Sequence, residues 1–381
     1  MTLIAVASTG IYCRSGCPAP APRATNVGRV PTAAAARAAG YRACKRCHPD
    51  DEIAPARGGI SVTEGSGSEC DLTLPYQGRR NLRALLDFLA ARAIPEVEAV
   101  TAGELIRTLR LDNGVGIARV TLQPGRVRCR TWVESADDDA PALAKVRSLL
   151  DLDRDLTAIE TDLRADAQMA SLMKGRRGTG VAGTVDGFEL AVRAILGQQV
   201  TVAGARTLAG RVVAAFGTAL PRHALAENAH DAARVEVTRV FPAPERLAEA
   251  DLAALGMPRS RAEAIRALAR RVAAGDIDLS ASAGVPEVRT SLLAIPGVGP
   301  WTAGYVAMRA QRDPDAFLPS DLGVRKAMVA LGVPDDPRAI GERAERWRPW
   351  RAYALQYLWA GSARSHHMIR LGRPDRLEGS P

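Results

Sequence analysis

Long apolar runs are missing from this sequence of 381 residues. A helix that crosses a bilayer needs about 20 consecutive apolar residues, and no stretch approaches that length. The opening residues, MTLIAVASTGIYC, also lack the basic segment and the long apolar segment of a secretory signal. We therefore expect a cytoplasmic protein that has no membrane partner.

Cysteine is scarce as well, with six residues in the whole chain. A reducing cytoplasm disfavours disulfides, and four of the six cysteines lie in two close pairs, which indicates a metal site. We interpret the other two, Cys70 and Cys129, as free thiols without a special role. Metal binding, rather than a disulfide framework, is thus the expected use of cysteine.

Acidic residues are fewer than basic ones: 42 Asp and Glu stand against 51 Lys and Arg, a formal charge of +9. An excess of cations favours a polyanionic partner, because lysine and arginine displace counterions from nucleic-acid phosphates. The charge alone does not distinguish nucleic acid from other acidic partners. With 47% apolar residues, a chain of this length builds roughly two to four globular units rather than one small domain.

Residues 1–52 form the first recognisable segment, which holds both cysteine pairs and many prolines. An alanine-rich stretch from Thr32 to Ala39 predicts a helix between the pairs. Residues 53–69 are rich in Gly, Ser and Pro and poor in apolar side chains, a composition typical of a flexible linker. We therefore place a domain boundary in this stretch.

The segment 70–178 mixes two periodicities. An amphipathic pattern from about Asn81 to Ala93 predicts a helix, and the run GIARVTLQPGRVRCRTWV alternates apolar and polar residues on both sides of Pro124-Gly125. Alternation interrupted by a Pro-Gly pair predicts two antiparallel strands joined by a turn. This segment is expected to be an α+β domain built on a sheet.

Strand-like alternation disappears after Gly183, and helical periodicity dominates from 179 to 372. Asp186 followed by Glu189 predicts a capping box at the start of one helix. Further amphipathic stripes are expected at 203–216, 260–273, 286–295, 301–310 and 347–360. The predicted fold class is multidomain α+β: a small cysteine-bearing module, an α+β sheet domain and an all-α domain.

The four paired cysteines have the spacing of a metal site. Cys13 and Cys17 form a C-x3-C pair and Cys44 and Cys47 a C-x2-C pair, so that each short turn directs two thiolates at one tetrahedral ion. Zinc is the natural occupant of such a site. Four free thiols are the alternative interpretation of the same residues.

The surrounding residues, GIYCRSGCPA and GYRACKRCHPD, resemble the amino-terminal metal-binding domain of the Ada alkylation-response proteins. The resemblance implies that Cys13 is a zinc-bound thiolate that accepts a methyl group from a methylated DNA phosphate, with Cys17, Cys44 and Cys47 as the other ligands. The sequence departs from the family in two ways: the segment before Cys13 is shortened, and no helix-turn-helix module follows. A purely structural zinc site therefore stays open as an alternative.

A glycine-rich turn lies between two predicted helices in LLAIPGVGPWTAGY. Gly297 and Gly299, on either side of Val298, can adopt backbone angles closed to other residues and leave amide hydrogens exposed at the positive end of the second helix. Such a turn binds phosphate. A plain connector is the alternative, because glycine and proline are common in turns between helices.

Asp321 lies downstream, in FLPSDLGVRK, where a further helix is expected to begin. An aspartate at that place is a favoured helix N-cap. A hairpin followed by a short helix, a loop and this aspartate also resembles the helix-hairpin-helix glycosylases of base-excision repair. The two interpretations are compatible, since a capping role does not exclude catalysis.

The resemblance extends to one family within that superfamily. Five segments of this chain resemble the 3-methyladenine DNA glycosylase II (AlkA) family in their order and spacing. They span residues 70–362 and are LLDFLAARAIPEVEAV, VDGFELAVRAILGQQVTV, FPAPERLAEADLAALGMPRSRAEAI, the hairpin and ERWRPWRAYALQYLWAG. The resemblance implies an enzyme that flips alkylated purines, of the 3-methyladenine and 7-methylguanine type, out of duplex DNA and hydrolyses their N-glycosidic bond. Asp321 would then be the catalytic carboxylate, because a negative charge near C1' stabilises the positive charge that develops on the sugar.

The resemblance also implies a base pocket lined by Trp301, Tyr305 and Trp359, whose electron-rich rings attract a cationic base. Aromatic residues are only 4% of the chain, yet four of its five tryptophans follow residue 300. Relatives that also nick the DNA strand place a lysine where this chain has Trp301. We therefore expect a monofunctional enzyme that leaves an abasic site.

Contacts with DNA follow from the same resemblance. Gln199, in the run GQQVT, stands where a family member inserts a side chain into the gap left by the flipped base. Arg193, Arg259, Arg325 and Lys326 are candidates for phosphate contacts, although each is also an ordinary solvated charge when considered singly. The family further implies a monovalent cation bound by carbonyl groups of the hairpin.

The expected partner is double-stranded DNA with alkylated bases, bound by a monomer that associates with the bacterial nucleoid. One alternative is a non-catalytic sensor or DNA-binding regulator, which recognises alkylation damage and binds the duplex without releasing a base. A second alternative, a bifunctional glycosylase/lyase, is disfavoured by the missing lysine.

Overall fold

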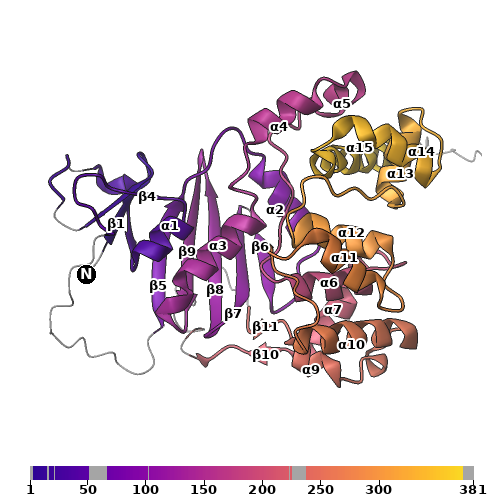
Figure 1. The fold of residues 1–381 in the computed structure, drawn as a ribbon, viewed down its shortest axis with the longest axis horizontal. Helices are drawn as coiled ribbons and strands as arrows, with labels where there is room; N and C mark the ends of the chain where they lie inside the picture. The colour runs from indigo at the N-terminus through magenta and orange to yellow at the C-terminus, as the bar shows by residue number, and fades with distance from the viewer. Residues whose placement is uncertain are drawn as a thin grey trace, which may run out of the picture.

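The structure is a computed structural model that describes residues 3–14, 17–20, 22–50, 67–101, 103–222, 224 and 237–371. Most of the expected linker at 53–69 lies outside the described residues. Within them, strands gather in the amino-terminal half and helices in the carboxyl-terminal half (Figure 1). The mixed α+β class expected from the sequence is confirmed. None of the described helices has the length and apolar character needed to cross a bilayer.

One sheet of nine strands runs through the amino-terminal half, in the order β4-β2-β1-β3-β5-β9-β8-β7-β6. Neighbouring strands pair antiparallel, except that β2 and β4 run parallel. The hairpin expected at Pro124-Gly125 is confirmed, since β8 and β9 flank it and Gly125 has the left-handed φ of 67° that suits a tight turn. The strands are β1 Leu3–Val6, β2 Ile11–Arg14, β3 Val27–Val30, β4 Arg42–Ala43, β5 Ser68–Leu74, β6 Glu98–Thr101, β7 Glu104–Leu111, β8 Gly114–Gln123 and β9 Arg126–Val133.

Helices pack on one face of this sheet. α1 (Ala33–Ala38) and α3 (Asp139–Leu149) lie side by side over the strands (Figure 1). α1 matches the expected helix from Thr32 to Ala39, and Thr32 caps it by accepting a hydrogen bond from the Ala35 amide at 3.0 Å. α2 (Leu82–Ala90) buries a leucine stripe of period 3.6, made of Leu82, Leu85, Leu86 and Leu89.

The carboxyl-terminal half is helical, as expected. Four of the stripes predicted at residues 203–310 coincide with helices to within one or two residues. The sequence did not predict the two-residue strands β10 (Thr218–Ala219) and β11 (Arg239–Val240), which are too short to show alternation. The helices are α4 Leu156–Leu163, α5 Ala167–Leu172, α6 Gly187–Leu196, α7 Val202–Phe216, α9 Pro244–Ala248, α10 Arg259–Ala273, α11 Val285–Leu293, α12 Pro300–Arg309, α13 Leu322–Ala330, α14 Pro337–Ala344 and α15 Arg351–Leu371.

The prediction for residues 347–360 was wrong about where the helix starts. A short 3-10 turn, η4 (Glu345–Trp347), comes first, and α15 begins only at Arg351. Pro349 explains the break, because a proline ring disfavours helical angles at the preceding residue, and Arg348 is extended with ψ of 143°.

The predicted capping box at the start of α6 is formed only in part. Asp186 does cap the helix, because its carboxylate accepts hydrogen bonds from the amides of Phe188 at 2.8 Å and Glu189 at 3.1 Å. The side chain of Glu189 does not return to the Asp186 amide, which bonds to the Thr184 hydroxyl instead. Glu189 pairs with Arg107 of β7, so tertiary contact replaces the local motif.

Candidate functional site

Asp321 stands immediately before α13 and is half-buried. Its Oδ1 accepts hydrogen bonds from the amides of Gly323 at 2.9 Å and Val324 at 3.0 Å, so the expected N-cap is present. The same carboxylate accepts from two indoles: Trp359 Nε1 donates to Oδ1 at 2.8 Å and Trp301 Nε1 to Oδ2 at 3.0 Å. The helix start and two aromatic side chains together fix the direction of this carboxylate.

Two pairs of stacked rings extend from those indoles. Trp301 lies parallel to Tyr305, with ring centroids 5.1 Å apart and an interplanar angle of 9°. Trp359 lies parallel to Phe88, at 6.2 Å and 16°. The structure therefore brings together Asp321 and all three aromatic residues expected to line a base pocket.

Arg309 links the free ends of the two stacks. Its Nη1 donates to the Tyr305 hydroxyl oxygen at 2.5 Å, and its guanidinium carbon lies 5.2 Å from the centroid of the Phe88 ring. The contacts thus close a ring, which we name the Asp321 circuit. Its members in order are Tyr305, Trp301, Asp321, Trp359, Phe88 and Arg309.

Phe88 is a member of this circuit that the sequence analysis missed. It belongs to α2 of the sheet-bearing half, whereas the other members come from the helical half. Phe88 is half-buried and lies off the leucine stripe of its helix, and Arg92 stacks on its ring at 3.8 Å. A large aromatic residue on the polar side of an amphipathic helix is the signal that could have identified it.

Burial and nearby cations act in opposite directions on the hydroxyl group of Tyr305. Burial of the side chain raises the pKa of this phenol, but the positive charges of Arg309 and Arg92 outweigh that effect, so its pKa is lowered from the ordinary value. Tyr305 is therefore more acidic than a free tyrosine and a stronger hydrogen-bond donor.

The hairpin joins α11 to α12 through Gly297, Val298 and Gly299. Gly297 has φ of 88°, which favours glycine, and Gly299 is the N-cap of α12. Both glycines are at least partly exposed, and no hydrogen bond of their amides is recorded within the described residues. Val298 differs, because its side chain is buried and its amide bonds to the Ile295 carbonyl at 3.0 Å. That arrangement argues against the predicted DNA contact by Val298.

The loop after α6 lies against this hairpin. The Gln198 side-chain amide donates to the Gly297 carbonyl and to the Thr302 hydroxyl, each at 3.0 Å. The next residue, Gln199, is exposed and has a left-handed φ of 55°, a conformation that costs energy for a residue other than glycine. Gln199 thus directly follows the residue whose side chain bonds to the hairpin.

The basic residues expected at phosphates differ in their surroundings. Arg325 forms a two-pronged pair with Asp335, at 2.8 and 2.9 Å, while Lys326 and Arg259 are exposed. Arg193 is a correction: it pairs with Glu98 at 2.7 Å and Glu189 at 2.8 Å and is largely buried. Charge alone could not show that Arg193 is committed to the protein interior.

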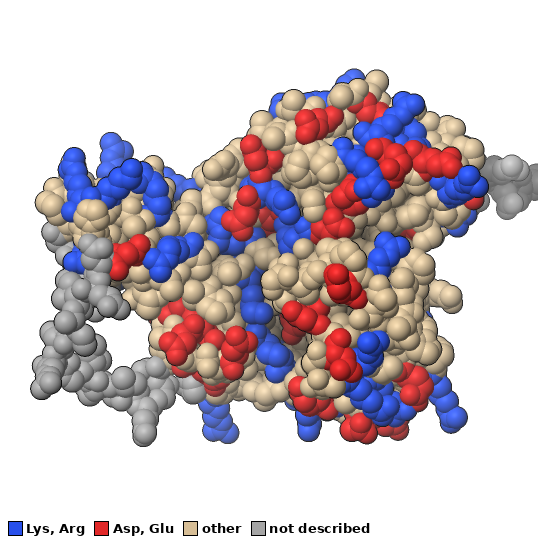
Figure 2. Space-filling view, viewed as in Figure 1, with Lys and Arg blue, Asp and Glu red and all other residues tan. Residues whose placement is uncertain are grey.

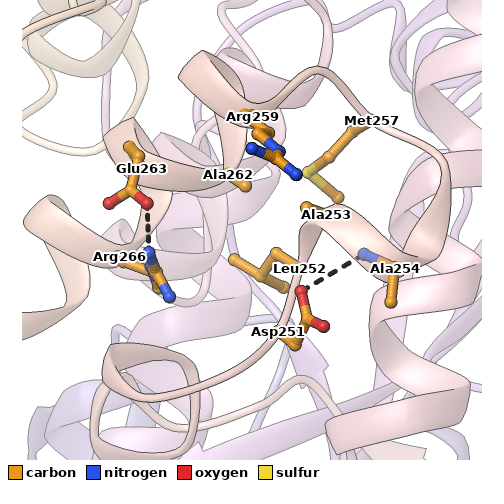
Figure 3. A pocket seen from close by; sticks show the side chains of 9 residues that line it. All are labelled: Asp251, Leu252, Ala253, Ala254, Met257, Arg259, Ala262, Glu263 and Arg266. Carbon is orange, nitrogen blue, oxygen red and sulfur yellow. Dashed lines mark hydrogen bonds and ion pairs between the residues drawn. The ribbon is translucent and has the colours of Figure 1, made fainter.

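A surface hollow of about 680 Å³ lies elsewhere, between η3 (Ala253–Leu255) and the amino end of α10 (Figure 3). Its wall includes the Arg266–Glu263 pair and Asp251, whose carboxylate accepts from the Ala254 amide at 3.3 Å. No member of the Asp321 circuit lines it. The hollow is therefore separate from the site around Asp321.

The four expected cysteines form a second site in the amino-terminal module. Their sulfur atoms all lie within 4.8 Å of one another, and Cys17 and Cys44 are 3.9 Å apart. Zinc–sulfur bonds of about 2.3 Å in a tetrahedron place sulfur atoms about 3.8 Å apart, so this donor set fits a zinc ion. The amides of Cys47 and Arg46 lower the pKa of the Cys44 thiol to about 6, which favours the thiolate that a metal binds.

Basic side chains surround this cysteine cluster. The exposed ones among the described residues of the module are Arg23, Arg29, Arg37, Arg42, Lys45 and Arg46. Figure 2 shows Lys and Arg gathered over the module that β1 and β4 mark in Figure 1. A zinc site with a cationic rim is suited to contact with phosphate groups.

Family models match three successive parts of the chain. They are described as the metal binding domain of Ada, over residues 2–50, the AlkA N-terminal domain, over 71–186, and the HhH-GPD superfamily of base excision DNA repair proteins, over 192–352. Among solved structures, the 3-methyladenine DNA-glycosylase of Archaeoglobus fulgidus has a TM-score of 0.65 at 22% identity and covers 76% of this chain and 98% of its own. That likeness supports the fold.

Two relatives have higher identity. A protein of Mycobacterium tuberculosis named "Probable bifunctional transcriptional activator/DNA repair enzyme AlkA" is 35% identical over 466 aligned positions, covering 94% of this chain and 92% of the relative. DNA-3-methyladenine glycosylase 2 of Escherichia coli is 34% identical and covers 75% of this chain and 96% of the relative. The chain therefore belongs to the AlkA family of helix-hairpin-helix DNA glycosylases, hydrolases of N-glycosidic bonds, and carries an Ada-type zinc-binding domain at its amino-terminal end.

Proposed function

We propose that this glycosylase releases alkylated purines, of the 3-methyladenine and 7-methylguanine type, from duplex DNA and leaves an abasic site. The observation that carries the proposal is the carboxylate of Asp321, which the indoles of Trp301 and Trp359 hold between two aromatic stacks. The name of the Escherichia coli relative, DNA-3-methyladenine glycosylase 2, agrees with this substrate class.

The chemistry follows from where charge develops. As the N-glycosidic bond breaks, its electron pair moves to the base and the sugar becomes an oxocarbenium-like cation. The Asp321 carboxylate stabilises that cation and orients the attacking water. An alkylated purine already carries positive charge and leaves as a neutral base, so the protein need not supply a strong acid. Electron-rich rings such as Trp301 and Trp359 attract the cationic base before cleavage.

Substitution of Asp321 by Asn tests the proposal. The amide keeps the N-cap oxygen but removes the charge, so the single-turnover rate of 3-methyladenine release should fall at least about a hundredfold. Binding to duplex DNA that holds a stable abasic analogue should persist. Wild-type protein that binds such DNA but releases no alkylated base would support the alternative, a damage sensor or DNA-binding regulator.

We propose further that the enzyme is monofunctional. Strand cleavage by a related mechanism needs an amine that forms a Schiff base with the sugar, and Trp301 stands at the start of α12 where that lysine would be. Borohydride should therefore fail to trap the protein on damaged DNA. A stable covalent complex would overturn this part of the proposal.

Duplex DNA is proposed to lie across the hairpin, with Gly297 and Gly299 amides on a phosphate and Gln199 in the gap left by the flipped base. A related glycosylase of Clostridium acetobutylicum has been solved with double-stranded DNA. Arg325 and Lys326 are secondary phosphate contacts in this arrangement. A monomer suffices, because every group that the proposal uses comes from one chain. Because the protein is proposed to bind DNA, we place it in the cytoplasm, in association with the bacterial nucleoid.

A monovalent cation at the hairpin stays part of the proposal. The Gly297 carbonyl already accepts from Gln198, and the Ile295 carbonyl from the Val298 amide, so a cation would share these oxygens through their second lone pairs. DNA affinity should then be higher in potassium chloride than in tetramethylammonium chloride at equal ionic strength. Equal affinity in the two salts would remove the cation from the proposal.

For the amino-terminal module we propose that Cys13 accepts a methyl group from a methylated DNA phosphate. Zinc, when bound, would keep the cysteine sulfur in the thiolate form. The Cys13 sulfur would attack the methyl carbon, an S–C bond would form, the O–C bond would break, and its electron pair would stay on the phosphate oxygen. Cys13 is only 7% exposed, which favours the alternative of a purely structural zinc site. Mass spectrometry after incubation with labelled methylphosphotriester DNA decides between them.

A further inference from the structure

The nine-stranded sheet has an outer face, opposite α1 and α3, whose side chains take no part in the Asp321 circuit or the hairpin. Residues paired across neighbouring strands point to the same face of a sheet. The strand registers place Cys13 of β2 in one row with Ile4 of β1, Arg29 of β3, Asp71 of β5 and Arg130 of β9. With strands about 4.8 Å apart, Cys13 and Arg130 are separated by about 19 Å along this row. The row thus begins at the zinc site and ends in the AlkA-type domain.

Alternation along the strands shows which face this row occupies. Tyr12, next to Cys13, belongs to the apolar cluster that also contains residues of α1 and α3. Val127 and Cys129, on either side of Arg128, belong to the same cluster. Because successive side chains of a strand point to opposite faces, Cys13 and Arg128 point away from the two helices.

The outer face is covered in one part and open in another. At β7 and β8, Ile106 and Ile117 pack in an apolar cluster with Leu220 and Val237, which lie between α7 and α9. The open part extends over the strands from β4 to β9 in the order of the sheet. Among its described residues it carries two acidic side chains and five arginines, an excess of three cations. They are Glu69, Asp71, Arg29, Arg42, Arg126, Arg128 and Arg130. We name these five arginines the arginine face.

The two domains hold their parts of the arginine face in a fixed relation. A Cβ atom at Gly28 of β3 would lie 2.8 Å from Leu72 Cδ2 and 2.9 Å from the Asp71 carbonyl oxygen, so the close approach of β3 to β5 requires glycine. Asp71 accepts from Arg128 Nε at 2.8 Å and from Arg130 Nε at 3.2 Å, which orients both guanidinium groups. These two arginine side chains nevertheless stay 41% and 51% exposed.

We propose that the arginine face binds the phosphate backbone of the duplex DNA whose methylated phosphate reaches Cys13. The AlkA-type domain then supplies part of the DNA-binding surface of the zinc-binding domain. The inference rests on the methyl transfer proposed for that domain. Phosphates are the partner that the chemistry favours, because arginine forms paired hydrogen bonds with phosphate oxygens and releases counterions from the duplex. The row of about 19 Å corresponds to somewhat more than half a turn of B-form DNA, whose turn is about 34 Å.

This surface is separate from the hairpin. The helical half meets the sheet at β6 and β7, through the buried pairs of Glu189 with Arg107 and of Arg193 with Glu98. The arginine face lies toward the opposite edge of the sheet, where β4 and β1 are found in Figure 1. One protein molecule should therefore bind two short duplexes at once.

A two-duplex binding experiment with the zinc-loaded, full-length protein tests the inference. The hairpin site is first saturated with an unlabelled duplex that holds a stable abasic analogue. A fluorescent, undamaged duplex of about 12 base pairs, slightly more than one helical turn, is then added, and its anisotropy is followed in a salt series. The wild type should bind this second duplex.

The double substitution Arg126→Gln with Arg130→Gln should weaken binding of the second duplex at least about tenfold. It should also lower the slope of log affinity against log salt by about 1.8, since each lost phosphate contact removes about 0.9. The matched control is Arg270→Gln with Arg338→Gln, which removes two exposed, ion-paired arginines of the helical half. Its affinity for the second duplex should equal that of the wild type.

The outcomes distinguish this inference from the proposed methyl transfer. Wild-type protein that binds no second duplex would overturn the inference without any variant. An equal loss in the control pair would assign the effect to net charge and would also overturn it. Polyglutamate that displaces the second duplex at equal charge concentration would assign the arginine face to acidic proteins, with the same consequence. A second duplex that binds and depends on Arg126 and Arg130, but gives no labelled methyl to Cys13, would support the arginine face and remove methyl transfer from the proposed function.

Discussion

The two oxygens of Asp321 have different partners: Oδ1 accepts from two backbone amides and from Trp359, whereas Oδ2 accepts from Trp301. The amides belong to the first turn of α13, so this single residue both starts a helix and presents a carboxylate. Catalysis depends on the position of such a group to within about an ångström. The indole donors, which do not react, are therefore expected to matter for the rate.

Trp359→Phe tests this positioning. The smaller ring can still stack on Phe88, but the N–H donor to Oδ1 is lost, so we expect the single-turnover rate of 3-methyladenine release to fall about tenfold. Trp350→Phe is the matched control, because its indole donates at 2.8 Å to Asp162, which is not part of the circuit. A loss of the same size in both variants would show a general effect of tryptophan on folding.

The site residues that belong to one sequence motif were the easiest to predict. Asp321, Trp301, Tyr305 and Trp359 follow the hairpin on neighbouring helices, and the structure brings them together. Phe88 comes from far away in the sequence, so no local pattern connects it with the others. Arg193 was predicted to contact phosphate for a related reason, since the sequence does not show which acidic residues meet it in space.

At the scale of elements, a buried ion cluster joins the sheet to the helical half. Arg107 of β7 pairs with Glu98 of β6 at 3.0 Å and with Glu189 of α6 at 2.8 Å, and Arg193 pairs with the same two glutamates. Two cations face two anions, so the cluster is neutral. Because α6 leads into the loop that carries Gln199, the cluster fixes one side of the expected DNA-binding surface relative to the sheet.

Glu189→Gln should destabilise the protein strongly. Removal of one charge leaves Arg107, which is only 3% exposed, with a single glutamate, and breaking a buried pair costs about 3–5 kcal/mol. Urea denaturation should show this loss in the free energy of unfolding. Glu342→Gln is the control, because Glu342 pairs with Arg338 at the surface, and such pairs contribute about 0.5 kcal/mol or less. A loss below 1 kcal/mol for Glu189→Gln would contradict the role given to the cluster.

The same cluster predicts a pH dependence. Burial alone would raise the pKa of Glu189, but Arg107 and Arg193 outweigh it and hold the pKa below the ordinary value. A carboxyl group whose pKa is lower in the folded state stabilises the fold above its unfolded pKa of about 4.3, and that stabilisation is lost as the pH falls. The wild type should therefore lose more stability than Glu189→Gln between pH 5 and 3. Parallel curves of unfolding free energy against pH would contradict this.

Elements were predictable where local chemistry decides their ends. Thr32 and Asp186 start helices because a side-chain oxygen satisfies amides of the first turn, and sequence alone shows such residues. The start of α15 was missed although Pro349 is visible in the sequence, because the apolar stripe continues across it. Glu189 fits a capping box locally but pairs with Arg107 in space, so tertiary contacts overrule the motif.

At the scale of the whole molecule, the zinc-binding domain and the AlkA-type domain share one sheet. β3 of the first pairs with β5 of the second, at Arg29 opposite Asp71. α1 packs against α3, and Arg147 of α3 donates to the Ala39 carbonyl at 3.0 Å and the Pro75 carbonyl at 2.9 Å. Composition suggested a boundary between these parts, but it could not show the docking, since the contacts join residues separated by up to 108 positions.

This docking predicts that zinc stabilises the glycosylase as well as its own domain. Buried residues of both domains form one apolar cluster, which includes Tyr12 and Tyr41 of the zinc-binding domain and Leu72 and Leu143 of the AlkA-type domain. Structural zinc contributes several kcal/mol to the folding of the domain that binds it. If the two domains unfold together, removing zinc with a chelator should lower the common unfolding midpoint by about 10 °C.

Calorimetry together with tryptophan fluorescence measures that coupling, because all five tryptophans lie outside the zinc-binding domain. Cys44→Ser should reproduce the effect of the chelator, since it removes one ligand from the cluster, and Cys129→Ser is the control for loss of a buried thiol without metal. A zinc-independent fluorescence midpoint, or two separate calorimetric transitions, would show that the domains only touch. Coincident transitions that shift together with zinc would show that the glycosylase depends on the metal site for its stability. The β3–β5 pairing and the α1–α3 contact give the physical reason, because unfolding of the zinc-binding domain removes both.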